Sequence, residues 1–178
     1  TQDAAVATAG SGNGFELNPT NAYADGGDVA SNIDGFGDQH IYYGYNLSAI
    51  PAGDIIDGIE VRLDWYLDSI SSTNSMSVQL SWDGGTTWTT AQTTAAEPIV
   101  EETTILGGPT NNWGHAWSVT ASNATNELSS TNFRVRVNSN SASAFRDFYL
   151  DWVPVRVYSH TPPEIDIQGN SISIPNGD

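Results

Sequence analysis

Four aspartates lie in a glycine-rich stretch near the start of the chain, a setting in which carboxylates can bind a metal ion. The stretch runs from residue 23 to residue 39 and holds Asp25, Asp28, Asp34 and Asp38 among four glycines. Calcium binds six to eight oxygens from carboxylates and backbone carbonyls, and glycine-rich loops leave both accessible. The spacing is not that of an EF-hand loop. The sequence therefore predicts a structural Ca²⁺ site at these four residues, with a solvated acidic loop as the alternative.

Aromatic side chains suggest a second kind of chemistry, because their faces stack on the apolar faces of sugar rings. Most of the aromatic residues are expected in the core, and Trp65, Trp82 and Trp152 lie at apolar positions of alternating segments. Exposure is expected instead for two tyrosines and for a tryptophan in the loop 107–114, where neighbouring polar side chains can hydrogen-bond sugar hydroxyls. These candidate ligand-binding residues are Trp113, Asn111, Asn112, His115, Tyr66 and Tyr42.

Catalytic motifs are missing from the sequence. The three histidines, His40, His115 and His160, do not form a His-Glu-x-x-His pattern, and there is no Gly-x-Ser-x-Gly elbow, P-loop or Rossmann glycine motif. A glycosidase needs two carboxylates on either side of a cleft, which the sequence alone does not assign to any pair. We therefore expect a protein that is not an enzyme, with a hydrolase built on a deep acidic cleft as a remote alternative.

The charge of the chain excludes several classes of partner. The 178 residues carry 21 acidic and five basic side chains, which gives a formal charge of −16. Such a protein is repelled by polyanions, so nucleic acid is not expected as a partner. All five basic residues are arginines and there is no cysteine, which excludes lysine Schiff bases, disulfides and cysteine metal sites. No apolar run is long enough to span a membrane as a helix, so membrane insertion is not expected.

The elements that must position these residues are β-strands. Residues 58–68 alternate apolar and polar side chains over ten positions, and residues 76–82 and 132–138 repeat the pattern. Residues 40–47 are also predicted to form a strand, with Ile41, Tyr43, Tyr45 and Leu47 on one face. The alternation changes phase between residues 148 and 157, and Pro154 at the change predicts a bulge or an edge position. Short strands with frequent turns predict an all-β fold, an antiparallel β-sandwich of jelly-roll type, with an immunoglobulin-like topology as the alternative.

Composition divides the chain into three parts. Residues 1–14 are small and polar and are predicted to form a flexible tail, residues 15–159 form the sandwich domain, and residues 160–178 form a second tail. Two prolines, Pro162 and Pro163, open this second tail. Its isoleucines alternate with polar residues between Glu164 and Ile174, which favours a strand added to a sheet edge of the same chain or of a neighbour, with a linker as the alternative.

The segment Ser81 to Trp88 has the most specific pattern in the chain. Its spacing, Ser-x-Asp-x-Gly-x-Thr-Trp, predicts a hairpin turn in which Asp83 accepts hydrogen bonds from backbone amides and Gly84 and Gly85 adopt positive φ. Trp88 is expected to fold back over the preceding strand. The pattern resembles the Asp-box of sialidases and other secreted β-proteins, in which the box has a structural role away from the chemistry.

The segments GIEVRLDWYL, SWDGGTTW and FYLDWVPVRVY give residues 15–159 a wider resemblance, to β-sandwich modules of bacterial and archaeal multidomain surface proteins of the adhesin type. This resemblance implies an extracellular location, secreted or at the cell surface. The main hypothesis is a non-catalytic module for surface adhesion or assembly, as a homo-oligomer or filament subunit, whose partners are glycans or neighbouring subunits. The alternative is a carbohydrate-binding module of a secreted glycoside hydrolase.

Overall fold

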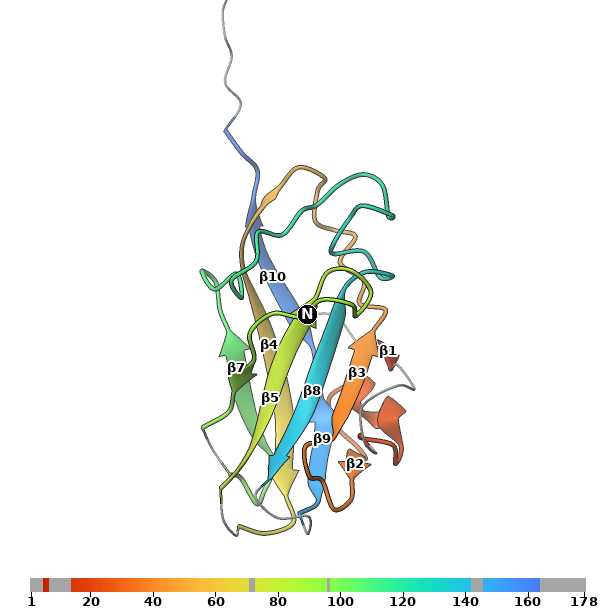
Figure 1. The fold of residues 1–178 in the computed structure, drawn as a ribbon, viewed down its shortest axis with the longest axis vertical. Helices are drawn as coiled ribbons and strands as arrows, with labels where there is room; N and C mark the ends of the chain where they lie inside the picture. The colour runs from red at the N-terminus through yellow and green to blue at the C-terminus, as the bar shows by residue number, and fades with distance from the viewer. Residues whose placement is uncertain (1–4, 7–13, 71–72, 96, 142–145, 164–178) are drawn as a thin grey trace, which may run out of the picture.

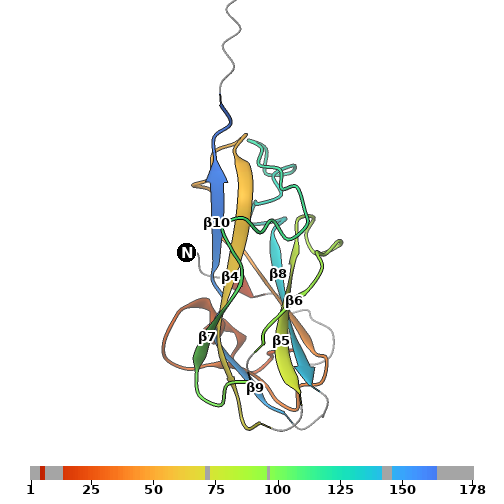
Figure 2. The same ribbon diagram turned by 90° about the vertical axis from the view of Figure 1, so that its left-hand side faces the viewer.

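Two antiparallel β-sheets pack face to face in the computed structural model, which describes residues 5–6, 14–70, 73–95, 97–141 and 146–163 (Figures 1 and 2). The front sheet of Figure 1 has the order β1 (Ala5–Val6), β3 (Gln39–Tyr43), β8 (Arg134–Ser141), β5 (Asn74–Ser81), β6 (Gln92–Thr93). The back sheet contains β10 (Val155–His160), β4 (Ile55–Leu67), β9 (Phe148–Trp152), β2 (Ala30–Asn32) and β7 (Glu102–Gly107). A short 3-10 helix, η1 (Pro19–Tyr23), precedes β2. The predicted all-β sandwich is confirmed, whereas the choice between jelly-roll and immunoglobulin-like topology stays a prediction.

Strand β4 organises the back sheet. Its alternation was the clearest strand signal in the sequence, and its apolar positions, among them Leu63 and Trp65, are fully buried between the sheets. One edge of β4 pairs with β7. The other edge pairs with β10 over the first half of β4 and with β9 over the second half, so β9 and β10 lie end to end along the same strand.

A β-bulge interrupts β9 where it runs beside β4. Trp152 pairs with Asp64 and Leu150 pairs with Trp65, so Asp151 is an extra residue with no partner position on β4. A bulge of this kind bends the strand and re-aims the neighbouring side chains. Leu150 faces the core and Trp152 lies on the opposite face of the sheet, beside Arg62. The irregularity predicted from the phase change is therefore present, three residues before Pro154.

The prediction that residues 40–47 form one strand with its odd-numbered residues on a single face was wrong. His40 and Tyr42 point into the core opposite Val137 and Val135, whereas Ile41 and Tyr43 lie on the outer side of the front sheet. The strand ends at Tyr43 because Gly44 adopts a φ of 80°, which is left-handed backbone. This turn resets the phase, so that Tyr45 and Leu47 are buried and do not share the face of Ile41 and Tyr43.

The Ser81 to Trp88 turn has the hydrogen bonds that its sequence predicts. The Asp83 carboxylate accepts the backbone amides of Thr86 and Thr87 at 3.0 and 2.8 Å, and Gly84 and Gly85 have φ values of 75° and 98°. Trp88 contacts β8, the strand that pairs with β5. Its ring lies beneath the guanidinium of Arg136 on β8, 4.0 Å from the ring centre, and its indole N–H donates to the carbonyl of Gly85.

Both predicted tails lie largely outside the described residues. Within the first, Ala5–Val6 form β1 and pair with Tyr43 and Tyr42 of β3, so at least this part of the tail joins a sheet. The strand predicted between Glu164 and Ile174 falls outside the described part and stays a prediction. In the described residues, no helix has the length and apolar character needed to cross a membrane.

Candidate functional site

The outer face of the back sheet, which points away from the core, carries a row of partly exposed aromatic side chains. They alternate with the buried residues of β4, β9 and β10, and they are Tyr66, Tyr149, Trp152 and Tyr158. Because β9 and β10 lie end to end, Tyr149 and Tyr158 mark the two ends of a row about 30 Å long at 3.3 Å per residue. We call this set the outer aromatic row.

Tyr66 and Tyr149 form a stacked pair at the lower end of the row. The two residues are directly paired across β4 and β9, and their ring centres are 4.7 Å apart with an angle of 23° between the planes. The Tyr149 hydroxyl donates to Asp147 at 3.3 Å. Burial first, and then the charge and hydrogen bond of Asp147, raise the pKa of Tyr149. Tyr149 is thus held by Asp147, and Tyr66 is stacked against it.

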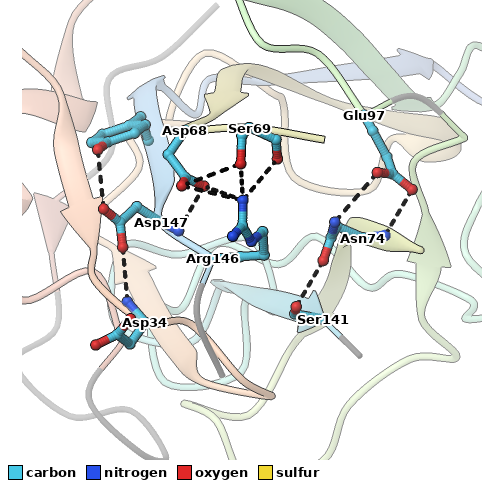
Figure 3. Close-up of polar contacts among 9 residues, drawn as sticks. Asp34, Asp68, Ser69, Asn74, Glu97, Ser141, Arg146 and Asp147 are labelled. Atoms are coloured by element: carbon cyan, nitrogen blue, oxygen red, sulfur yellow. Dashed lines mark hydrogen bonds and ion pairs between the residues drawn. The ribbon is translucent and has the colours of Figure 1, made fainter. Parts of the chain in front are cut away.

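Asp147 belongs to a polar network that closes the end of the sandwich (Figure 3). One Asp147 carboxylate oxygen accepts the backbone amide of Asp34 at 3.0 Å, and the Asp147 amide donates to Asp68 at 3.1 Å. Arg146 donates to Asp68 at 3.2 Å and also to the hydroxyl of Ser69. The network joins the ends of β4 and β9 to the loop after β2, and so supports the Tyr149 side of the stacked pair.

The middle of the row contains an ion pair between a buried carboxylate, Asp64, and a partly exposed guanidinium, Arg62. Asp64 is only 1% exposed. The Arg62 guanidinium contacts its two carboxylate oxygens at 2.6 and 2.8 Å, and the Thr103 hydroxyl donates to it at 2.6 Å. The guanidinium of Arg62 also lies over the ring of Trp152, 4.8 Å from its centre. The hydrogen bond to Asp64 is the main reason why the pKa of Arg62 is raised. Arg62 is therefore held against Trp152 and presents a fixed donor surface.

The upper end of the row borders a hollow. Tyr158 donates its hydroxyl to Glu60 at 2.9 Å and lines, with Asp57, Thr110 and Ser159, an open hollow of about 580 Å³. That volume falls in the range of small-molecule sites. The hollow therefore borders the end of the row that is farthest from the stacked pair.

A cluster of three carboxylates lies where the loop after η1 meets the bulge of β9. One oxygen of each of Asp25, Glu101 and Asp151 lies within 4.8 Å of the others. The backbone brings them together because Gly26 and Gly27, with φ values of 87° and 114°, turn the loop so that the Gly26 amide donates to Asp151 Oδ2 at 2.8 Å. Glu101 stands immediately before β7. We call these residues the carboxylate cluster.

The electrostatics of the carboxylate cluster are unbalanced. Loss of solvent, followed by the negative charges of Asp151, Asp64 and Asp25, raises the pKa of Glu101. Arg62 is the cation beside the cluster, 3.6 Å from Asp25, but its shorter contacts are with Asp64. Asp151 is 1% exposed, and its Oδ1 atom has no hydrogen-bond partner among the described residues.

The four aspartates predicted to bind a metal do not come together. Among the described residues, only Asp25 lies in a group of three possible ligands, and its companions are Glu101 and Asp151. Asp28 is exposed, and Asp34 is engaged through its backbone amide at the end of the sandwich. The carbonyl of Asp38 accepts the Ser139 amide at 2.9 Å. The loop is too long for its carboxylates to converge, since β2 lies between Asp28 and Asp34.

Two of the predicted ligand-binding aromatics are in the core. Trp113 is 4% exposed, because its indole packs on β4 and donates to the carbonyl of Ile59 at 2.8 Å. Tyr42 is completely buried between the sheets, and burial raises its pKa far above the usual range. The expectation that these two rings are accessible to a ligand was wrong. A buried tryptophan keeps its N–H bonded and contributes its whole apolar surface to the core.

The polar residues around Trp113 hold their own loop. Asn111 accepts the Trp113 amide at 2.9 Å, and Asn112 accepts the Gly114 amide at 3.0 Å. His115 stacks on Trp82 with 3.8 Å between ring centres and contacts Glu127 at 3.0 Å. Most of their hydrogen-bonding capacity is used within the protein. Of the predicted ligand residues, Tyr66 is the one that stands on the outer face of the back sheet.

Sequence reasoning missed Tyr149, Trp152, Tyr158, Glu101 and Asp151. The alternation of the sequence placed Trp152 on the core side of its strand. The bulge at Asp151 turns it to the outer face instead. Asp151 itself was a usable signal, since a carboxylate between Leu150 and Trp152 interrupts an otherwise apolar strand. Nothing local in the sequence links Glu101 to it, because the link depends on β7 and β9 pairing with opposite edges of β4.

No protein-family model matches the chain, and no curated protein sequence matches it. The functional argument therefore rests on the geometry and chemistry of the described residues. What these define is an all-β sandwich with an aromatic strip on one outer face.

Proposed function

We propose that this protein is a non-catalytic, extracellular adhesion module that binds glycans along the outer aromatic row. The stacked pair of Tyr66 and Tyr149 carries the proposal. It offers an aromatic surface that is already fixed by Asp147, so that little side-chain entropy is lost when a sugar ring stacks on it. Neighbouring groups suited to hydroxyl recognition lie on the same strip, namely Arg62, Glu60 and the hydroxyl of Tyr158.

The charge of the protein favours neutral glycans. A formal charge of −16 repels sialylated or sulfated chains at long range, whereas uncharged polysaccharides experience no such barrier. The row is also long compared with a single sugar ring, which favours an extended chain over a monosaccharide.

Binding to uncharged polysaccharides, measured by affinity electrophoresis, tests the proposal. The wild-type protein is expected to be retarded, and Tyr66→Ala is expected to lose up to about tenfold in affinity, because an aromatic stack contributes on the order of 1 kcal/mol. Tyr43→Ala is the matched control, since Tyr43 is a partly exposed tyrosine beneath Arg134 on the outer side of the opposite sheet.

Equal retardation of the wild type and Tyr66→Ala would remove the outer aromatic row as the binding site. Loss of binding in Tyr43→Ala alone would move the site to the front sheet. If the wild type binds no polysaccharide, glycan binding itself is wrong.

A second observation favours assembly with neighbouring subunits. Within the described residues β7 pairs with β4 on one side only, and apolar side chains on β7 and in the segment before it are exposed. Val100 is 73% exposed, and Ile99 and Ile105 are each 54% exposed. A free strand edge flanked by apolar side chains is a template for adding a strand from another chain. The isoleucine-rich segment from Glu164 to Ile174, outside the described residues, is the proposed donor.

Mass measurement and imaging of the purified chain test this assembly. Oligomers or filaments are expected for the wild type and for Ile33→Lys, an exposed isoleucine that follows β2 at the opposite edge of the back sheet. Ile105→Lys, and truncation after Thr161, are expected to give monomers. A wild-type protein that is monomeric at every concentration would rule the assembly role out.

A further inference from the structure

The carboxylate cluster has the geometry of a shared cation site. Calcium binds oxygen ligands at 2.3–2.6 Å, so two ligands on opposite sides of one ion are about 4.6–5.2 Å apart. One oxygen from each of Asp25, Glu101 and Asp151 lies within 4.8 Å of the other two. An ion placed between the three oxygens is therefore close to the calcium–oxygen distance from each of them, and small side-chain rotations complete the contacts.

The buried oxygen of Asp151 is an independent indication of a ligand. Asp151 is 1% exposed, its Oδ2 atom accepts the Gly26 amide, and its Oδ1 atom has no protein partner within the described part of the chain. A buried carboxylate oxygen that lacks a hydrogen bond is costly, and such groups call for a specific explanation, of which a bound ion is one. The Asp151 carboxylate faces Asp25 and Glu101, which are both exposed and leave room for water as further ligands.

The protein itself does not neutralise this cluster. Arg62 is its nearest cation, and it makes its shortest contacts, 2.6 and 2.8 Å, with Asp64, while its contact with Asp25 is 3.6 Å. Three carboxylates against a partly shared guanidinium leave an excess of negative charge. A divalent cation would remove that excess.

The kind of ion follows from the donors. All three are hard carboxylate oxygens, with neither imidazole nor thiolate among them, which suits calcium or magnesium and disfavours zinc or copper. Ligands that come from three separate segments, two of them exposed, suit the flexible coordination of calcium better than the strict octahedron of magnesium.

We propose that Asp25, Glu101 and Asp151 bind one calcium ion, which ties the loop after η1 and the start of β7 to the bulge in β9. This inference goes beyond the proposed function and does not depend on glycan binding. The three segments are far apart in the sequence, so the ion acts as a cross-link across the outer face of the back sheet. Of the four aspartates that the sequence predicted as calcium ligands, this site contains only Asp25.

Calorimetric titration of the EDTA-treated full chain with CaCl₂ tests the site. One Ca²⁺ per chain is expected for the wild type, and Asp151→Asn is expected to weaken binding at least tenfold. The control is Asp28→Asn, which removes an exposed carboxylate from the same loop but outside the cluster and is expected to bind Ca²⁺ like the wild type. Titration with MgCl₂ at the same concentrations is expected to give weaker binding.

Melting temperatures supply a readout that separates metal binding from simple damage to the fold. In EDTA, Asp151→Asn is expected to melt at or above the wild-type temperature, because it removes a repelling charge and its amide oxygen can still accept the Gly26 amide. In CaCl₂ the order is expected to reverse, since only the wild type is stabilised by the ion.

Several outcomes would overturn the proposal. These are the absence of Ca²⁺ binding at millimolar concentrations, equal binding by the wild type and Asp151→Asn, or loss of binding in Asp28→Asn to the same extent as in Asp151→Asn. Equal or tighter binding of Mg²⁺ would overturn the assignment to calcium.

Discussion

The buried His40 should make the protein sensitive to mild acid. His40 lies on β3 facing the core, is 4% exposed, and accepts the backbone amide of Phe15 through Nδ1 at 3.2 Å. A proton on Nδ1 would break that bond and place a charge in the core, and the other ring nitrogen has no partner among the described residues. Burial lowers the pKa of His40 from 6.5 to about 4.

The sign and size of the effect follow from proton linkage. Between pH 6.5 and pH 4 the unfolded chain binds a proton at this histidine and the folded chain does not, so stability is complete above pH 6.5 and is lost as the pH falls toward 4. For a pKa that changes from 6.5 to about 4, the loss at pH 4.5 is about 2.5 kcal/mol. That is a large part of the stability of a typical domain.

Urea unfolding at pH 7.5 and pH 4.5 measures this loss, with His40→Gln as the variant. Glutamine does not titrate, and its side-chain oxygen can accept the Phe15 amide. Between the two pH values the wild type is therefore expected to lose about 2.5 kcal/mol more than His40→Gln. Comparing the two proteins cancels the contribution of the acidic residues. The exposed His160 provides the control His160→Gln, which is expected to keep the acid sensitivity of the wild type.

The reasoning would be refuted if the wild type and His40→Gln lost stability in parallel between pH 7.5 and pH 4.5. An equal loss of unfolding free energy in acid would mean that His40 is protonated in the folded state or is solvated in a way that its burial does not indicate.

Three further substitutions test other contacts by the free energy of urea unfolding at pH 7.5. Trp113→Ala removes a buried indole and its bond to Ile59, and is expected to cost about 3–5 kcal/mol, whereas a loss below about 1 kcal/mol would mean that Trp113 is not a core residue. Asp83→Ala removes the acceptor for two turn amides and is expected to cost about 1–3 kcal/mol, and an unchanged stability would show that the turn does not need this carboxylate. Gly58→Ala places a Cβ against the carbonyl oxygen of Gly108 and is expected to cost about 1–3 kcal/mol, so wild-type stability would contradict the close packing seen there.

The sequence predicted those parts of the fold that depend on local alternation. The pattern of β4 and the turn at Asp83 could be found because side-chain period and turn chemistry are properties of neighbouring residues. The inward face of β3 could not, because the positive φ of Gly44 separates two phases that look like one strand in the sequence. Trp113 was expected to be exposed because its loop is polar, yet its indole anchors that loop to β4.

The candidate site was harder to predict because it depends on pairing between distant segments. Asp25 and Tyr66 could be singled out by residue type. Their companions Asp151 and Tyr149 are placed by the register of β9 on β4, including a one-residue bulge, and a slip of one residue would turn each of them to the other face. Glu101 joins them only because β7 runs along the opposite edge of the same strand.

The double pairing of β4 also bears on how the protein opens. On one edge β7 covers β4 between Glu60 and Trp65, and on the other edge β10 and β9 cover most of its length, so the amides of this strand are expected to exchange with solvent only when the back sheet comes apart. Strand β6, by contrast, meets β5 through only two paired residues, at the margin of the front sheet. Local fluctuations should therefore begin at β6, while β4 stays closed until global unfolding and the outer face that it carries persists as one rigid surface.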